Sequence, residues 1–118
     1  MPNVARKNAV DLVDSPDGNP GTPCDGGAKK ICDVPSIQAT AAGSPDVFIE
    51  GVGVVRELDA MIAHPAPVCG CSPHAPTLSV FSSRVFANGK RIGRIGDSYD
   101  GHVIITGAST VFDGSAQA

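Results

Sequence analysis

One phrase occurs twice in this chain, at a spacing of 38 residues, and it limits the possible folds more than any other feature. Residues 46–64 read DVFIEGVGVVRELDAMIAH, and residues 84–102 read RVFANGKRIGRIGDSYDGH. The corresponding residues are Val47 and Val85, Phe48 and Phe86, Arg56 and Arg94, Asp59 and Asp97, and His64 and His102. Internal self-similarity of this kind indicates a fold that uses one small unit several times.

Fragments of the same unit occur near both ends of the chain. Residues 14–19 (DSPDGN) match residues 97–102 (DSYDGH), with Asn19 at the position of the histidine. A third Val-Phe pair, residues 111–112, follows a glycine at the same spacing as residues 47–48. We therefore expect three copies of the unit and a pseudo-threefold shape. Coincidence among common strand and turn residues is the alternative, and the identical spacing from Val-Phe to His in two copies disfavours it.

The copies consist of short runs rich in Val, Ile, Phe and Thr, which are typical of strands when Gly, Pro, Asn and Asp separate them. The runs that predict strands are 47–50, 78–83, 84–88, 91–96, 102–107 and 109–114. Asn88-Gly89 predicts a hairpin with a type I′ turn, and Glu50-Gly51 has the equivalent place in the earlier copy. Weak helical periodicity occurs at 3–13 and 55–63, but we favour a strand over 52–58.

Length and composition exclude several classes of protein. We expect one domain, residues 1–118, of a mostly β fold. The 14 Gly and 10 Pro residues indicate that turns predominate over long elements. The net charge of −3 arises from mixed signs without a basic stripe, so we expect no nucleic-acid partner. The chain lacks the apolar run of a membrane span or secretory signal, so we expect cytoplasmic synthesis without a signal peptide.

The proline-rich segment 64–76 (HPAPVCGCSPHAP) concentrates residue types that bind metals. The candidate ligands are His64, Cys69, Cys71, His74 and, as the repeat counterpart of His64, His102. Thiolate and imidazole together suit a tetrahedral Zn(II) site, with Fe as the second choice. A small fold with few aromatic side chains gains stability when a metal ties its loops together. We therefore expect a metal site.

Two other roles stay open for the same residues. They can be buried small side chains and a loop histidine without a ligand role. Alternatively, a disulfide can join Cys24 or Cys32 to Cys69 or Cys71, although four cysteines in a cytosolic chain favour metal.

Catalytic motifs are incomplete. The glycine-rich segments lack the full dinucleotide or phosphate-loop pattern, and no serine has a Gly-x-Ser-x-Gly context. A catalytic metal needs a nearby base, and the candidates are Asp59, Asp97 and Asp100. Arg56 and Arg94 each precede an Asp by three residues, where we expect local ion pairs. The sequence therefore predicts a protein that is not an enzyme.

Several phrases resemble the PAAR-repeat proteins, which tip the spikes of type VI secretion systems, contractile phage tails and related extracellular injection systems. The phrases are SPDVFIEG (44–51), RVFANGKRIGRIGD (84–97), DGHVIITG (100–107) and GASTVFDG (107–114). The opening MPNVAR and the CGCSP stretch at 69–73 are also similar to the family. The resemblance covers most of residues 1–6 and 43–114.

Two features depart from the family pattern. Arg91-Ile92-Gly93 replaces Pro-Ala-Ala, and the family's early histidines are absent between residues 14 and 34. The resemblance therefore implies a metal shell drawn mainly from the five candidate ligands, which Cys24, Cys32 or Asn19 can complete.

The resemblance implies a small conical, pyramidal β-rich fold with zinc, held by His and Cys, near its apex. Its base would sit on a trimeric β-helical spike protein, so that three repeats of one chain face three chains. The protein would sharpen the spike, help it pierce a target membrane and carry effector cargo, as part of a contractile particle delivered outside the cell. The alternatives are a small metal-dependent hydrolase using His64, His74 and His102, and a secreted β-rich binding module held by disulfides.

Overall fold

The computed structural model describes residues 2–14, 37–63 and 75–118 in full, and the backbone alone at 22–23, 31–32, 64–65 and 73–74. The described residues contain no helix and form short strands in small sheets, so the prediction of a mostly β fold is confirmed. None of these residues belongs to a helix that is long and apolar enough to cross a membrane.

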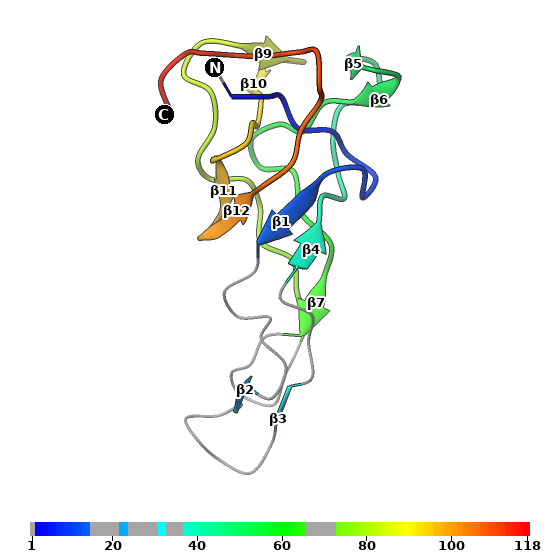
Figure 1. Ribbon diagram of the computed structural model, residues 1–118, viewed down its shortest axis with the longest axis vertical. Coiled ribbons are helices and arrows are strands. Elements are labelled where there is room, and N and C mark those ends of the chain that lie inside the picture. Colours follow the sequence, from blue (N-terminus) through cyan, green and yellow to red (C-terminus); the bar gives the residue numbers. More distant parts are fainter. Residues whose placement is uncertain (1, 15–21, 24–30, 33–36, 66–72) are drawn as a thin grey trace.

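The largest sheet has four antiparallel strands. In spatial order they are β11 (Ser98–Tyr99), β12 (His102–Ile104), β1 (Leu12–Asp14) and β4 (Ile37–Ala39). Four two-stranded antiparallel pairs accompany it: β5 (Phe48–Ile49) with β6 (Val52–Gly53), β9 (Phe86–Ala87) with β10 (Lys90–Arg91), β7 (His64–Pro65) with β8 (Pro73–His74), and β2 (Thr22–Pro23) with β3 (Ile31–Cys32). Figure 1 shows β5, β6, β9 and β10 at the same end as both chain termini, and β7 farther along the long axis.

The two predicted hairpins form as expected. Glu50 and Gly51, between β5 and β6, have φ angles of 49° and 81°. Asn88 and Gly89, between β9 and β10, have φ angles of 56° and 76°. A two-residue turn with positive φ at both positions matches the twist of the flanking strands.

Three extended segments, residues 4–6, 54–56 and 92–94, meet in a closed cycle of backbone hydrogen bonds. The Ala5 N–H donates to the Gly93 carbonyl (2.9 Å), Gly93 N–H to Val55 (2.9 Å), and Val55 N–H to Ala5 (3.0 Å). We call these three residues the central ring. A Cβ at Gly93 would lie 2.8 Å from Cδ2 of the buried Leu78, so a side chain at this position of the ring would have to displace that leucine.

The residues beside the central ring repeat the same hydrogen bonds three times. On one side, the N–H groups of Val4, Val54 and Ile92 donate to the carbonyls of Val111, Val47 and Val85 at 2.9–3.0 Å. On the other, the N–H groups of Lys7, Glu57 and Ile95 donate to the carbonyls of Gly53, Arg91 and Asn3 at 2.6–2.9 Å. The two copies of the repeated phrase therefore occupy equivalent places, and the third place is filled from the two ends of the chain.

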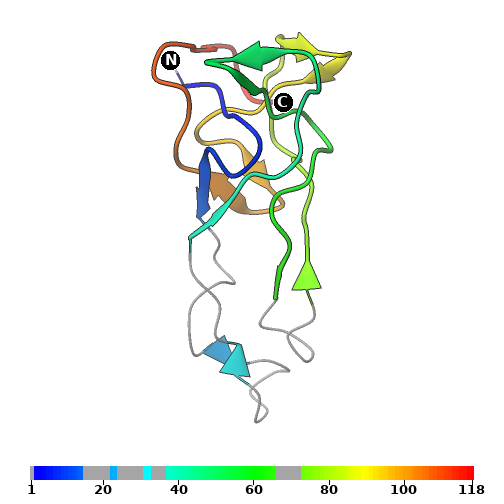
Figure 2. The same ribbon diagram turned by 90° about the vertical axis from the view of Figure 1, so that its right-hand side faces the viewer.

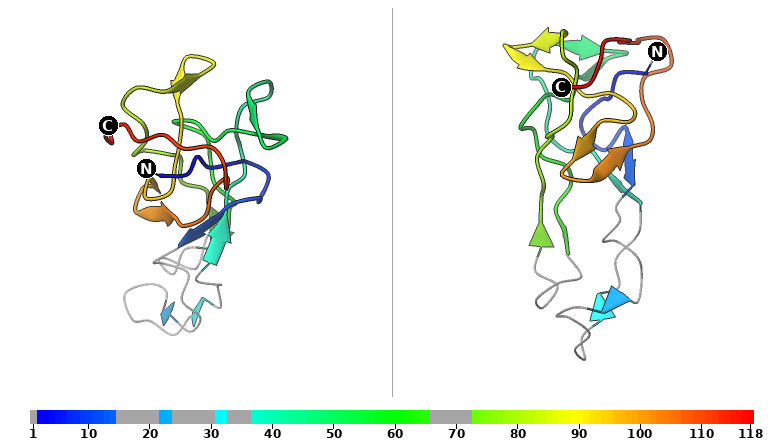
Figure 3. Two further views of the ribbon diagram at one scale, coloured as in Figure 1. Left: turned by 45° about the horizontal axis from the view of Figure 1, so that its top comes forward. Right: turned by 90° about the vertical axis from the view of Figure 1, so that its left-hand side faces the viewer.

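The chain termini replace the turn of the third hairpin. Asn3 forms a bridge with Phe112, as Gly53 does with Phe48 and Arg91 with Phe86. The Asp113 N–H then donates to the Pro2 carbonyl at 2.9 Å. Figures 2 and 3 show from other sides that both termini lie at the end occupied by the two complete hairpins.

Some runs predicted as strands are broken by the same arrangement. Residues 78–83, 92–96 and 109–114 make single bridges, such as Val80 with Ser98, in place of continuous ladders, and only Arg91 of the predicted run 91–96 belongs to a strand pair. Residues 3–13 are not helical, and Asn8 and Ala9 have φ angles of 61° and 62°.

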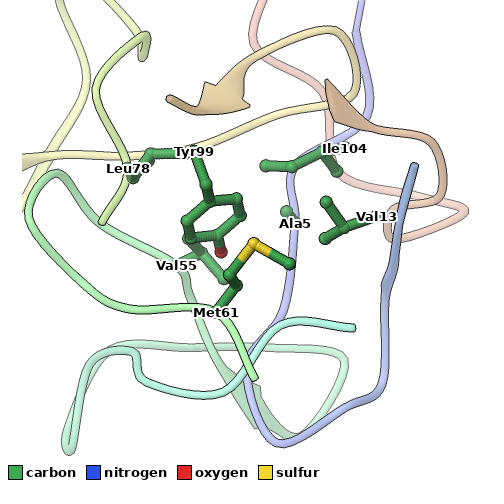
Figure 4. Close-up of a cluster of buried hydrophobic side chains, with 7 residues drawn as sticks. All are labelled: Ala5, Val13, Val55, Met61, Leu78, Tyr99 and Ile104. Carbon is green, nitrogen blue, oxygen red and sulfur yellow. The ribbon is translucent and has the colours of Figure 1, made fainter. Parts of the chain in front are cut away.

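The ring separates two apolar clusters, because successive residues of an extended segment point to opposite faces. Val4, Val54, Ala87 and Ile92 pack together on the side of the hairpins, with Ile49 and Val111 against them. The opposite cluster, drawn in Figure 4, comprises Ala5, Val13, Val55, Met61, Leu78, Tyr99 and Ile104.

Replacing Tyr99 by Phe should leave the fold intact and raise the free energy of unfolding by about 1 kcal/mol. The side chain is fully buried, and its hydroxyl finds no hydrogen-bond partner among the described residues. Burial, with the charges of Asp59 and Asp11, raises the pKa of the Tyr99 hydroxyl far above its usual range. Urea unfolding of both forms measures the change. A decrease in the free energy of unfolding by more than about 1 kcal/mol would instead show that the Tyr99 hydroxyl makes a hydrogen bond.

Candidate functional site

Three arginine–aspartate pairs, which we call the Arg–Asp clamps, hold the chain as it leaves the central ring. In each clamp the arginine backbone N–H and Nε–H donate to aspartate Oδ2, and a terminal guanidinium nitrogen donates to Oδ1. The clamps, with their Nε–Oδ2 distances, are Arg6–Asp11 (3.0 Å), Arg56–Asp59 (2.8 Å) and Arg94–Asp97 (2.9 Å).

The local ion pairs expected at Arg56 and Arg94 are confirmed. The clamp at Arg6 was missed, because its aspartate lies five residues on instead of three. The left-handed residues Asn8 and Ala9 absorb the two extra positions. The repeat match to residues 14–19 had placed the corresponding aspartate at residue 14, which instead lies in β1.

Hydrogen bonding to the aspartates stabilises the charged arginines. The pKa of Arg6 is raised above its ordinary value, chiefly by its bond to Asp11, and that of Arg56 chiefly by its bond to Asp59. The Arg94 clamp is the most enclosed, since its arginine and aspartate side chains are 1% and 0% exposed.

Each clamp also binds the tip of a neighbouring hairpin. Arg6 Nη1 donates to Glu50 Oε1 (3.0 Å), and Arg56 Nη1 donates to Asn88 Oδ1 (3.1 Å). Arg94 Nη1 donates to the carbonyl of Ser115 (2.6 Å), which follows the open third hairpin. The clamps therefore link the two complete hairpins and the open third one in a closed cycle.

Glu50 shows how tightly a hairpin tip is held. Its Oε2 accepts hydrogen bonds from the Thr110 N–H (2.9 Å) and hydroxyl (2.6 Å), and from the Ser109 hydroxyl (3.2 Å). The bonds from Thr110, with smaller contributions from Ser109 and Arg6, hold the pKa of Glu50 below its usual range.

The hairpin end of the molecule is apolar and exposed. Its three corners are the Val-Phe pairs at residues 47–48, 85–86 and 111–112, which we call the base platform. Phe48, Phe86 and Phe112 are 57%, 52% and 49% exposed. Because the valine carbonyls accept equivalent hydrogen bonds beside the ring, the three pairs are arranged around it.

An open hollow of about 160 Å³ lies in the middle of the base platform. It is lined by Val4, Val47, Ile49, Val54, Val85, Phe86, Ala87, Ile92, Val111, Phe112 and Asp113. All three Val-Phe pairs contribute to this wall, and Asp113 is its charged member. An exposed apolar surface with a central hollow is typical of a protein-binding face.

The structure brings two of the predicted metal ligands together. The register of β7 and β8 pairs His64 directly with His74. Cys69 and Cys71 lie outside the described residues, as do Cys24 and Asn19, so the predicted shell and the disulfide alternative remain predictions. Cys32 lies in β3.

His102 lies in a different sheet from His64 and His74. It is buried, and its Nδ1 lies 2.9 Å from the Tyr99 carbonyl. A carbonyl oxygen can only accept, so Nδ1 carries the hydrogen of this bond. Within the described part of the chain, no three His, Cys, Asp or Glu residues form a group that could hold a metal.

The candidate bases of the hydrolase alternative are mostly engaged. Asp59 and Asp97 are bound by the guanidinium groups of two clamps. Asp100 is exposed in the turn between β11 and β12, with a φ angle of 51°. A carboxylate that accepts several hydrogen bonds from a guanidinium has fewer lone pairs left for a substrate or a water.

No protein-family model matches the chain, and a search of curated proteins finds no match.

Replacing Arg94 by Ala should lower the free energy of unfolding by about 3–5 kcal/mol, because Asp97 would remain buried without its cation. Arg56→Ala should cost about 2 kcal/mol, since that clamp lies nearer to solvent, with side chains 13% and 7% exposed. Urea unfolding measures both. The exposed Arg84→Ala variant is the control and should change stability by less than about 0.5 kcal/mol. Equal losses of unfolding free energy in the Arg94→Ala and Arg56→Ala variants would contradict the conclusion that the more buried clamp contributes more to stability.

Proposed function

We propose that this protein is a PAAR-like tip that caps the trimeric β-helical spike of a contractile injection apparatus. In this proposal the base platform sits on the blunt end of the spike, and the domain tapers away from it as a cone. The role is mechanical: the cap sharpens the spike, covers its open strand ends and leads it into a target membrane. Effector cargo would travel with the same cap.

The observation that carries this proposal is the threefold repetition of apolar corners on one chain. Residues of all three Val-Phe pairs line one hollow, and the carbonyl of each valine accepts the same hydrogen bond from a residue beside the central ring. A partner with a true threefold axis presents three identical surfaces, and a single chain can match them by repeating its own surface. The resemblance to PAAR-repeat proteins supports the same partner.

We propose in addition that zinc joins the loops at the end of the cone opposite the base. The pairing of His64 with His74 in β7 and β8 supports this, because residues opposite each other in an antiparallel pair can serve one ion. Cys69, Cys71 and His102 remain the other proposed ligands. The metal would be structural, so its binding energy would contribute to folding.

The docking proposal predicts that Phe48→Glu weakens binding to the cognate trimeric spike by about 2 kcal/mol or more, because a charge would be buried at the interface. Binding is measured by titration calorimetry, and the complex should contain one cap per spike trimer by light scattering. Leu58→Glu is the matched control: Leu58 is 66% exposed but lies outside the base platform, and its variant should bind normally. A folded protein that does not bind its cognate spike would refute the proposal.

The metal proposal predicts stoichiometric zinc in the purified protein and its loss in His64→Ala and His74→Ala. Elemental analysis measures the metal content, with Lys90→Ala as a control that keeps it. Removal of zinc by a chelator should lower the thermal unfolding midpoint, because the ion would contribute to folding. A catalytic zinc would instead leave the midpoint nearly unchanged while abolishing turnover, which would favour the hydrolase.

A further inference from the structure

The rim of the base platform carries a fixed cation at the Phe86 corner. Arg91 of β10 lies directly opposite Phe86 of β9, so both side chains lie on one face of the hairpin. Arg91 Cζ lies 5.6 Å from the centre of the Phe86 ring and 5.7 Å from the centre of the Phe81 ring. Two aromatic rings therefore orient a guanidinium group beside an exposed phenylalanine of the platform.

No described anion pairs with this guanidinium. The arginines of the clamps each bind an aspartate, but within the described part of the chain the side chain of Arg91 makes no hydrogen bond or ion pair. Glu57 Oε1 accepts a hydrogen bond from the Arg91 backbone N–H (3.0 Å) and forms no ion pair with the guanidinium. Because arginine stays protonated in proteins, Arg91 presents a positive charge without a counter-charge.

The terminal nitrogens of Arg91 are the atoms that a partner can reach. The residue is half-buried, and its Nε is enclosed, whereas Nη1 and Nη2 are not. The two terminal nitrogens lie in one plane and can donate together to both oxygens of a carboxylate. The aromatic contacts already restrict the side chain, so little conformational entropy remains to be lost on binding.

The Phe48 corner has a cation in the equivalent place. The residue opposite Phe48 is Gly53, and the Lys7 side chain lies over it: a Cβ at Gly53 would be 2.6 Å from Lys7 Cε. Lys7 likewise forms no ion pair with any residue that the structure describes. Different segments of the chain therefore bring an unpaired cation to the same place at two corners of the base platform.

The third corner is neutral in this place, with Asn3 opposite Phe112. A cation at two of three equivalent corners indicates what a partner presents there. A partner with a threefold axis has the same side chain at every corner, and a carboxylate is the side-chain group that both a guanidinium and an ammonium bind. Charged pairs at the rim of an interface fix its register and speed association.

We propose that each chain of the trimeric spike presents one acidic side chain at the rim of the base platform, and that Arg91 and Lys7 bind two of the three copies. Arg91 donates from Nη1 and Nη2 to one carboxylate, and the Lys7 ammonium binds the second. This inference rests on the proposed capping function for the source of the carboxylates, and it adds the charge that the spike must carry around its axis.

The first test uses two probes of equal shape, phenylacetate and its neutral amide, phenylacetamide. The ring of either probe can contact the exposed Phe86, but only the carboxylate can pair with Arg91. Each probe is titrated into the full chain, and binding is followed by the NMR signals of the Phe86 ring and the Arg91 guanidinium. Phenylacetate should bind at least about threefold more tightly than the amide. Equal binding of the two probes, or no binding of phenylacetate at this corner, would overturn the proposal.

Arg91→Gln should abolish the preference for phenylacetate at the Phe86 corner. Arg91→Lys keeps the charge without the planar pair of donors, so it should retain part of the preference. Arg84→Gln is the matched control, because Arg84 carries the same charge before the same hairpin, is exposed and contacts no described aromatic ring. Methyl signals of Val13 and Ile104 verify that each variant is folded. An unchanged preference in a folded Arg91→Gln variant would overturn the proposal.

The second test replaces the probes by the cognate spike. Arg91→Gln should weaken the complex about tenfold, Lys7→Gln should weaken it as well, and Arg84→Gln should not. Raising the ionic strength from about 0.05 M to about 0.5 M should weaken binding of the unaltered protein much more than binding of the Arg91→Gln, Lys7→Gln double variant, because salt screens the proposed pairs.

The two proposals fail in different ways. If the unaltered protein does not bind the spike, the capping function fails, and the probe series still decides whether Arg91 binds a carboxylate. If the spike binds the unaltered protein and the double variant equally, capping stands and the inference falls.

Discussion

The closed cycle of three backbone hydrogen bonds at Ala5, Val55 and Gly93 is the interaction on which the rest of this structure depends. Each segment of the ring is too short to make a stable strand pair with one neighbour. In a cycle each segment donates to one neighbour and accepts from the other, so the ring has no open edge. Closure also fixes the faces of the segments: Val4, Val54 and Ile92 face the base platform, and Ala5 and Val55 face the opposite core.

The Arg–Asp clamps extend this closure to the side chains. Each clamp arginine lies one residue beyond the ring and binds the aspartate that follows it in the chain. Its Nη1 bonds in addition to the tip of a neighbouring hairpin or, for Arg94, to the segment after the open third hairpin. A chain with one Tyr and no Trp has little aromatic surface for its core. Bidentate Arg–Asp pairs have a defined geometry, so they fix the orientation of the chain segments that a small core alone leaves unspecified. Their burial makes the clamps intolerant of losing one partner.

The three units of the base platform share some features and differ in others. The equivalent hydrogen bonds place three Val-Phe pairs around one hollow, which suits the proposed threefold partner. The positions that differ are Ile49, Ala87 and Asp113 in the wall of the hollow. A single chain can vary its three corners independently, which a homotrimer cannot.

The sequence by itself determined the local features of this protein. Asn88-Gly89 and Glu50-Gly51 specify their turns through backbone preference, and an arginine three residues before an aspartate specifies a local ion pair. Only the tertiary structure decided how the third unit is assembled. It joins residues 2–4 to residues 108–113, and it uses Asp11 for the clamp. The pairing of His64 with His74 was likewise decided by register. The third unit depends on hydrogen bonds between segments that are distant in the chain, and no local preference encodes such partners. The Asp11 clamp depends on the left-handed turn at Asn8 and Ala9, which the spacing of the other two clamps does not predict.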